Sequence, residues 1–257
     1  MASWIIAIAN QKGGVGKTTT TINLATEIQG RGSRVLLIDL DPQGNATTGS
    51  GIDKKTVTSS VYDVLANGIG IADVRVKSGS GHYDVLPANQ DLAGAEVELV
   101  EVQNRDQRLK QALTAVHDEY DYVLVDCPPA LSLLTLNGLA AARSVMIPMQ
   151  CEYYALEGLS DLVNTIKRVK LRLNPQLEIG GLVRTMFDGR NSLTNQVSEQ
   201  LLHHFGAKVF ETVIPRNVRV AEAPSFGMPV TVYDKLSKGA EAYRALTDEF
   251  LLRFEKG

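Results

Sequence analysis

Residues 4–19 read WIIAIANQKGGVGKTT and join a short apolar run to a glycine-rich loop. The run from Trp4 to Ala9 is continuously apolar, as in a strand that is buried on both faces. The glycines behind it would let backbone N–H groups approach phosphate oxygens, and the helix predicted for residues 18–29 would add the positive potential of its N-terminus. Strand, loop and helix in this order predict a phosphate-binding loop.

This loop is a deviant form of the Walker A pattern G-x-x-x-x-G-K-[ST]. Gln11 stands where the pattern has its first glycine, and Lys12 directly precedes Gly13, which gives K-G-G-x-G-K-T with two lysines. We expect Lys17 to reach the β and γ phosphates and the Thr18 hydroxyl to coordinate Mg²⁺. The alternative, a glycine-rich turn without a ligand, is disfavoured by the flanking strand and helix.

Short apolar runs alternate with helical patterns along the rest of the chain. Strands are predicted at residues 34–39, 83–86, 122–126, 144–148, 177–185 and 208–214, and further helices at 91–102, 105–117, 131–142, 156–173, 191–204 and 238–254. This alternation is typical of a doubly wound α/β fold, a mostly parallel sheet with helices on both faces. Since no linker or repeat interrupts it, we expect one domain spanning residues 1–257. Ligands should bind beyond the carboxyl ends of the strands.

Carboxylates stand where two of the predicted strands end. Asp39 and Asp41 close the second strand, and Asp126 closes the strand at residues 122–126. A phosphoryl-transfer site needs Mg²⁺ near the β and γ oxygens and a group that positions the attacking water. We expect Asp126 to act on Mg²⁺, through water, and Asp41 to orient the nucleophile, with Asp39 as the weaker candidate. Each aspartate could instead cap the turn or helix that follows it.

The composition is that of an ordinary soluble globular protein, with 44% hydrophobic and 21% charged residues. A net charge of −3 excludes nucleic-acid binding driven by overall basicity. Residues 163–220, however, hold nine Lys or Arg against four Asp or Glu, so a local basic patch is possible. The alternative is a solvated helix face, particularly for the basic residues between Lys167 and Arg172.

Cysteine use and the N-terminus indicate a cytoplasmic protein. The two cysteines, Cys127 and Cys151, are too few for a disulfide framework or a zinc site and are expected to be buried thiols. The apolar run at Trp4–Ala9 is too short for a transmembrane helix or a signal peptide.

Five motifs in fixed order carry a family resemblance: KGGVGKTT at 12–19, DLDPQGN at 39–45, DCPP at 126–129, QCEYYALEG at 150–158 and PRNVR at 215–219. Together they resemble the ParA/Soj chromosome-partitioning ATPases, members of the deviant Walker A group that also includes MinD and the nitrogenase iron protein. The resemblance runs from about Trp4 to the C-terminal helix and therefore covers nearly the whole chain.

The resemblance implies an ATP hydrolase that uses ATP and Mg²⁺ and forms a homodimer when ATP is bound. The dimer would bind double-stranded DNA without sequence preference, and a ParB-type protein would stimulate hydrolysis and release it. Such a protein is cytoplasmic and nucleoid-associated and has no membrane partner.

The same resemblance assigns roles residue by residue. The catalytic set would be Lys12, acting on the partner's nucleotide, together with Lys17, Asp41 and Asp126. The phosphates would be bound by Lys12, Gly13, Gly14, Val15, Gly16, Lys17, Thr18 and Thr19, with Thr18 and Asp126 at the metal. Pro215 and Asn217 would lie against adenine, and Arg190 and Arg219 would bind DNA.

Other functions remain open at this stage. Some plasmid relatives carry an N-terminal helix-turn-helix domain, which we do not expect here, since the first strand begins at Trp4. A MinD-like membrane regulator would need an amphipathic C-terminal helix, but residues 240–254 are short and acidic and should pack against the sheet. A positioner of carboxysomes or chemoreceptor arrays would share the site but not the partner. A metabolic P-loop ligase would need a substrate motif that we do not find.

Overall fold

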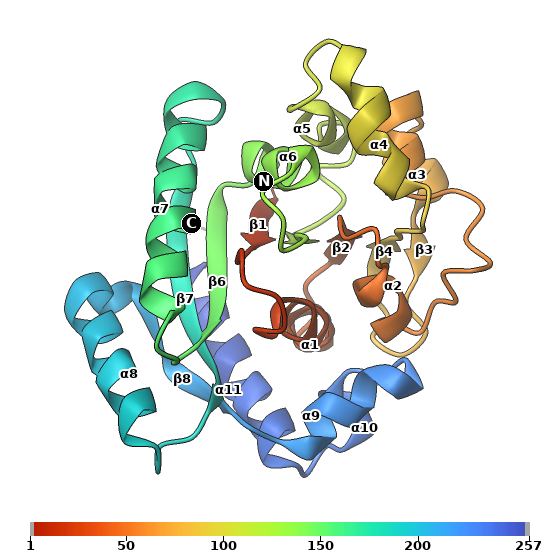
Figure 1. Ribbon diagram of the computed structural model, residues 1–257. Helices are drawn as coiled ribbons and strands as arrows, with labels where there is room; N and C mark the ends of the chain where they lie inside the picture. Colours follow the sequence, from red (N-terminus) through yellow and green to blue (C-terminus); the bar gives the residue numbers. More distant parts are fainter. Residues whose placement is uncertain (1–2, 255–257) are drawn as a thin grey trace.

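The computed structural model describes residues 3–254, and its strands form one eight-stranded sheet in the order β3-β4-β2-β5-β1-β6-β7-β8 (Figure 1). Every neighbouring pair is parallel except β3 and β4, which are antiparallel. The mostly parallel sheet predicted from the sequence is therefore confirmed. The strands are β1 (Trp4–Ile8), β2 (Val35–Asp39), β3 (Val76–Lys77), β4 (Asp84–Leu86), β5 (Tyr122–Asp126), β6 (Ser144–Gln150), β7 (Glu178–Phe187) and β8 (Val209–Pro215).

Helices cover both faces of the sheet, which makes the fold doubly wound (Figure 1). One face packs against the helices from α3 to α8, and the other mainly against α1 and α11. The helices are α1 (Lys17–Gly30), α2 (Asn45–Gly49), α3 (Ile71–Val74), α4 (Leu92–Glu98), α5 (Arg108–Leu113), α6 (Leu133–Ala141), α7 (Ala155–Arg172), α8 (Ser192–Phe205), α9 (Val218–Glu222), α10 (Val230–Tyr233) and α11 (Lys238–Arg253). The expectation of one domain for residues 1–257 stays a prediction.

The central strands are apolar on both faces because each face is covered. In β1, Ile6 and Ile8 belong to the cluster with α1 and α11, and Ala7 belongs to the cluster on the opposite face. All five residues of β2 and of β5 are buried. These strands form a rigid layer that fixes the position of the loops leaving their carboxyl ends.

Several elements differ from those predicted. The helix expected at 105–117 is only α5, which begins three residues later and ends four residues earlier. The Asn137 side chain of α6 accepts from Leu109 N in the first turn of α5 and donates to the Arg105 carbonyl before it. The helix expected at 91–102 is divided into α4 and a 3₁₀ turn at Leu99–Glu101. The short elements β3, α2, α3, α9 and α10 were not predicted.

The C-terminal helix and the cysteines agree with the predictions. Tyr243 and Phe250 of α11 are buried in the cluster that covers the sheet. Cys127 and Cys151 are both buried free thiols. Within residues 3–254, no helix has the length and apolar character needed to cross a membrane.

Candidate active site

The glycine-rich loop connects β1 to the first residue of α1 at the carboxyl edge of the sheet. Gly14 and Gly16 have φ values of +72° and +86°, a left-handed conformation that only glycine adopts without strain. The Thr185 hydroxyl, at the end of β7, donates to the Val15 carbonyl at 2.8 Å. The loop is thus shaped by its glycines and held in place by a neighbouring strand.

A second anchor of the loop is Asn10, which the sequence analysis did not single out. Its Oδ1 accepts from Lys12 N at 3.0 Å, and its Nδ2 donates to the Pro148 carbonyl of β6 at 2.8 Å. Asn10 therefore ties the start of the loop to the sheet. Its place between the apolar strand and Lys12 was the only signal available in the sequence.

The two lysines of the loop point in different directions. Lys17 is buried, and its Nζ donates to the Lys12 carbonyl at 3.1 Å, so its charge lies inside the loop. Burial lowers the pKa of Lys17, while the charges of Asp126 and Asp41 oppose that shift. Lys12 instead forms an ion pair with Glu152, in the loop after β6, and both side chains are about half exposed.

Asp126 lies at the end of β5, next to the first turn of α1. One of its oxygens accepts from the Thr18 hydroxyl at 2.7 Å and the other from the Thr21 hydroxyl at 3.1 Å. Burial, and then the nearby charge of Asp39, raise the pKa of Asp126. The structure therefore brings Thr18 and Asp126 together, a hydroxyl and a carboxylate that fit the oxygen ligands preferred by Mg²⁺.

Asp39 and Asp41 are two residues apart but have different surroundings. Asp39 is fully buried, and its Oδ2 accepts from both the backbone N–H and the hydroxyl of Thr47 at 2.8 Å. Its Oδ1 accepts from Asp41 N at 3.1 Å. Asp39 thus fits the alternative of a structural role, holding α2 against the sheet. Asp41 lines the cavity beside the loop, as a group that acts on a ligand must.

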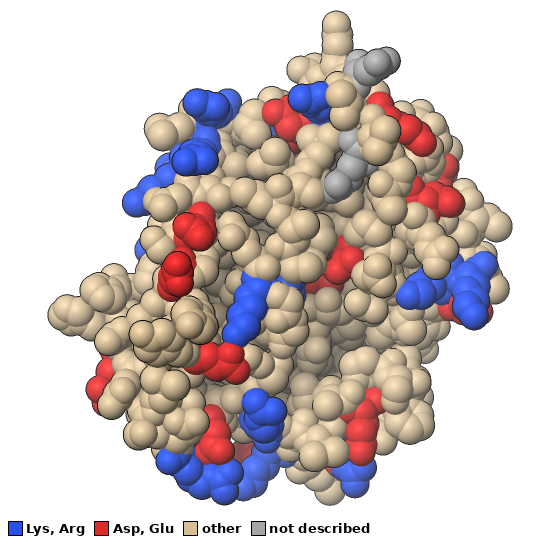
Figure 2. Space-filling view, in the orientation of Figure 1, with Lys and Arg blue, Asp and Glu red and all other residues tan. Residues whose placement is uncertain are grey.

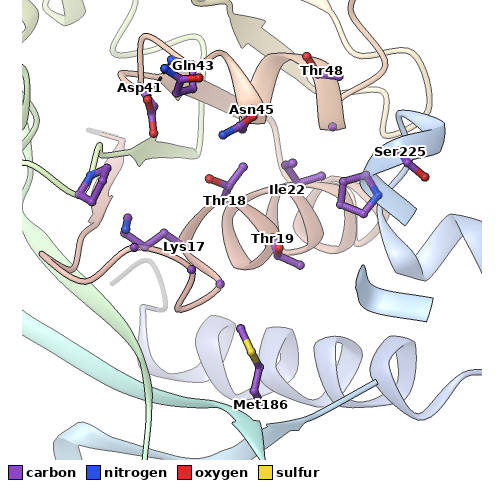
Figure 3. A pocket seen from close by; sticks show the side chains of 16 residues that line it. Lys17, Thr18, Thr19, Ile22, Asp41, Gln43, Asn45, Thr48, Met186 and Ser225 are labelled. Atoms are coloured by element: carbon purple, nitrogen blue, oxygen red, sulfur yellow. Dashed lines mark hydrogen bonds between the residues drawn. The ribbon is translucent and has the colours of Figure 1, made fainter. Parts of the chain in front are cut away.

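A cavity of about 640 Å³ lies in front of the loop. Figure 3 shows Asp41, Gln43 and Asn45 across from Lys17 and Thr18, with Met186 on the far side. Sequence reasoning missed Gln43 and Asn45, although both belong to the DLDPQGN motif and their amides can bind polar groups. The lining residues are Gly13, Gly14, Gly16, Lys17, Thr18, Thr19, Ile22, Asp41, Gln43, Asn45, Thr48, Gly49, Pro129, Met186, Pro224 and Ser225.

A smaller cavity of about 170 Å³ adjoins the first, and Gly16, Thr19 and Met186 line both. Its other walls come mainly from residues 214–221, so Pro215 and Asn217 do lie next to the glycine-rich loop. Asn217 also caps α9, because its Oδ1 accepts from Arg219 N at 2.9 Å and Val220 N at 3.3 Å. The mainly apolar wall is suited to a flat base, and the larger cavity is suited to phosphates.

The two arginines expected at DNA lie in different settings. Arg190 follows β7, its side chain is 90% exposed, and it pairs with Asp188 at 2.9 Å. Arg219 in α9 is 52% exposed and pairs with both Glu222 at 2.9 Å and Asp234 at 3.3 Å. Each arginine reaches the surface, but Arg219 is already shared by two acids.

The basic excess at residues 163–220 is smaller at the surface than in the sequence. Arg184 is buried, and its guanidinium donates to the Ser198 hydroxyl and to the carbonyls of Phe210 and Glu211. Four other basic residues of this segment are exposed toward the end of α7, where Figure 2 shows Lys and Arg gathered at the upper left. These exposed residues are Lys167, Arg168, Lys170 and Arg172.

Several of the most similar curated proteins are chromosome-partitioning proteins. A family model described as "AAA domain" matches residues 3–179. The chromosome partitioning protein ParA of Caulobacter vibrioides is 53% identical over 97% of this chain and 94% of its own length. The sporulation initiation inhibitor protein Soj of Bacillus subtilis is 54% identical over 95% of this chain and 97% of its own. An uncharacterised protein of Pseudomonas putida is 60% identical over 97% of this chain and 95% of its own length.

Solved structures share the fold, and one of them contains an ATP analog and magnesium. A Mycobacterium smegmatis protein, described as cobyrinic acid a,c-diamide synthase with bound ATP analog and magnesium, has a TM-score of 0.87 and 37% identity, covering 99% of this chain and 97% of that one. The cell division ATPase MinD of Pyrococcus furiosus has a TM-score of 0.80 and 26% identity, covering 96% and 98%. The partitioning proteins are the more similar in sequence, at 53% and 54%.

The cofactors of this chain are ATP and Mg²⁺, in agreement with the solved structures that contain an ATP analog or ADP with magnesium. The loop, the Thr18–Asp126 pair and the two adjoining cavities have the arrangement that a magnesium nucleotide would fit. Nucleotide hydrolysis in general is supported by relatives over nearly the whole chain that are named chromosome-partitioning ATPases. On its motifs, fold and similarity to ParA and Soj, the chain belongs to the ParA/Soj family of chromosome-partitioning ATPases.

Proposed function

We propose that this partitioning ATPase is a dimer switch, in which two ATP-bound subunits pair face to face and bind double-stranded DNA without sequence preference. A ParB-type partner stimulates hydrolysis and so releases the dimer from DNA. The observation that carries the proposal is the position of Lys12, whose ammonium leaves its own loop and meets Glu152 at the surface. A lysine that its own loop does not use is available to the nucleotide of a second subunit.

Within one subunit, the loop binds the phosphates. The backbone N–H groups from Gly13 to Thr19 surround them, and Lys17 neutralises the β and γ oxygens. Thr18 and Asp126 hold Mg²⁺, which when bound would stabilise the negative charge on the transferred phosphoryl group. Asp41 lines the same cavity and orients the attacking water.

The face around Lys12 has the character of an interface. Tyr153 and Tyr154 directly follow Glu152 and are 73% and 71% exposed. Leu131, in the loop after β5, is also exposed. Exposed aromatic and aliphatic side chains in a polar surround are typical of surfaces that bind another protein. A second subunit docked here would cover them and receive Lys12.

DNA binding would use exposed, positively charged side chains, and a single subunit has few of them. Arg190 is the most accessible candidate, and Arg219 would have to exchange Glu222 and Asp234 for phosphate. Pairing two subunits doubles the contacts, so the dimer is the form that holds DNA. We therefore also propose a cytoplasmic, nucleoid-associated location without a membrane partner.

The buried stripe of α11 disfavours the MinD-like alternative. Tyr243, Leu246 and Phe250 pack into the core and are not available to a lipid surface. A cargo-positioning ATPase would use the same nucleotide site and dimer, so the identity of the stimulating partner separates it from a segregation ATPase.

The dimer switch is tested by size-exclusion chromatography and ATP turnover of three variants. Wild type should be dimeric with ATP and monomeric with ADP. Asp41→Ala should bind ATP, lose hydrolysis and accumulate as a dimer, because its carboxylate orients water and does not hold the nucleotide. Lys12→Ala should bind ATP but stay monomeric, whereas Lys55→Ala, which removes an exposed lysine remote from the loop in sequence, should behave as wild type.

Normal ATP-dependent dimerisation of Lys12→Ala would contradict the proposal, even if nucleotide binding and hydrolysis by the wild type were confirmed. Full turnover by Asp41→Ala would remove that residue from the catalytic set.

A further inference from the structure

Met186 has a backbone conformation that its side chain does not favour. Of the residues described, three other than glycine have a positive φ: His82, Asn104 and Met186, with φ +47° at Met186. Asparagine and histidine adopt the left-handed region more readily than most residues, and methionine does not. A residue kept in such a conformation indicates a local requirement that outweighs the strain.

Core packing does not account for this conformation. Met186 is half-buried and lies outside both hydrophobic clusters of the described core. It is the residue after Thr185, whose hydroxyl holds the Val15 carbonyl. The pairing of β7 with β8 shifts register between Arg184 and Phe187, so Met186 lies within an irregularity of the strand. Such irregularities next to active sites redirect a side chain.

The redirected side chain lies at the boundary between the two cavities. Met186 lines both the cavity of about 640 Å³ and the one of about 170 Å³, together with Gly16 and Thr19. Figure 3 shows it pointing from β7 toward the start of α1. The Gln150 side-chain amide lies directly against its Sδ.

We propose that Met186 is a nucleoside-contacting residue, whose thioether packs against the ribose and the base of the bound nucleotide while the loop binds the phosphates. The inference rests on the proposed nucleotide site and adds a specificity-determining residue to it. A polarisable, unbranched thioether makes favourable contacts with aromatic rings and adapts to their position. The strained backbone is retained because an extended residue here would direct the side chain away from this boundary.

The test compares a ligand that has a nucleoside with one that has none. Dissociation constants of ADP and of inorganic pyrophosphate, each with Mg²⁺, are measured by calorimetry for wild type, Met186→Ala and Met186→Leu. Met186→Ala should weaken ADP binding about tenfold and leave pyrophosphate binding within about twofold, since only the apolar contact is lost. Met186→Leu keeps an apolar side chain and should bind ADP within about threefold of wild type. Met228→Ala, which removes an exposed methionine that lines neither cavity, is the matched control.

A second measurement avoids substitution at the site. In protein labelled at the methionine ε-methyl groups, ADP should shift the Met186 resonance through the ring current of the base, and pyrophosphate should not. The Met186→Leu spectrum assigns that resonance among the five methionines.

Equal weakening of ADP and pyrophosphate by Met186→Ala would overturn the inference, because the residue would then act through the phosphate loop. Unchanged ADP affinity, or a Met186 resonance indifferent to ADP, would overturn it as well. None of these results depends on dimerisation, so failure of the dimer switch would be recognised separately.

Discussion

Lys12 and Glu152 form an ion pair between two side chains that are about half exposed. Such a pair contributes only about 0–1 kcal/mol, because water screens it and both side chains lose conformational freedom. The pair can therefore open readily when the phosphates of a second subunit approach. In the dimer switch that we propose, Glu152 would compete with those phosphates for the ammonium group of Lys12.

Glu152→Gln should accordingly favour dimerisation. Removing the carboxylate frees Lys12, so the ATP concentration needed for half-maximal dimer should fall by about two- to fivefold. Light scattering across an ATP titration measures this, with Glu157→Gln, an exposed glutamate in the first turn of α7, as the control. Weaker dimerisation of Glu152→Gln would mean that the carboxylate itself contacts the second subunit.

Asp39 makes the stability of the protein depend on pH. Burial raises its pKa from 3.8 to about 6, although hydrogen bonds from Thr47 and Asp41 oppose the shift. Because the pKa of Asp39 is raised in the folded state, its contribution to stability is fully present below pH 3.8 and is lost as the pH rises from there to about 6. Ionised Asp39 also lies near Asp126, whose pKa it raises.

Asp39→Asn should therefore become relatively more stable as the pH increases. The variant loses part of the bonding to Thr47, so it is expected to melt below wild type at pH about 5. At pH about 8 the difference in melting temperature should narrow, because only the wild type carries the buried charge. Thermal unfolding followed by circular dichroism at both pH values measures the change. If the difference in melting temperature between wild type and Asp39→Asn instead widened toward pH 8, ionisation of Asp39 would not destabilise the folded protein and the prediction would be wrong.

At the scale of single elements, a side chain of α11 accepts hydrogen bonds from backbone N–H groups of the edge strand β8. The Glu249 carboxylate accepts from Glu211 N at 2.8 Å and from Thr212 N at 3.0 Å. Unpaired N–H groups at an edge strand invite pairing with another chain. Glu249 therefore both stabilises the contact between β8 and α11 and protects the edge.

Glu249→Ala should lower the free energy of unfolding by about 1–3 kcal/mol, since two backbone N–H groups lose a charged acceptor. Urea denaturation checks this value, and light scattering of the folded variant reports any association through the edge. Glu199→Ala, at an exposed position of α8, is the control and should change little. Equal free energies of unfolding for Glu249→Ala and Glu199→Ala would show that the Glu249 carboxylate does not stabilise the folded protein.

The elements that the sequence predicts well are those whose signal is local. The strands β1, β2, β5 and β6 are continuous apolar runs, and α8 follows directly after Asn191, a residue type that caps helices and here accepts from Leu193 N and Thr194 N. The short helices depend on distant partners, such as the bond of Asp39 to α2. β3 has two exposed residues and hence no apolar pattern.

The residues of the site likewise divide into those with a local sequence signal and those whose position depends on distant parts of the chain. The glycine-rich loop and the aspartates at strand ends are visible in the sequence, because backbone geometry and topology suffice to bring them together. The direction of Met186 depends on a register shift in β7, and the contact of Lys12 depends on a loop 140 residues away in the chain. Neither has a local signal.

On the scale of the whole molecule, the DNA binding that we propose for this acidic protein would have to use a small exposed surface. The net charge is −3, Arg184 is buried, and Arg219 is paired with two acids. Arg190 has the most accessible guanidinium of the three. One subunit therefore offers few phosphate contacts, and the account requires ATP-dependent pairing to hold DNA.

The most direct test is the affinity for double-stranded DNA of random sequence, measured across a salt series with ATP and with ADP. Wild type should bind only with ATP, and the logarithm of its affinity should fall linearly with the logarithm of salt concentration. Arg190→Ala should bind more weakly and lower that slope by about two per dimer, whereas Arg34→Ala, an exposed arginine paired with Asp121, should not. Equal affinity with ATP and ADP would contradict the dimer switch.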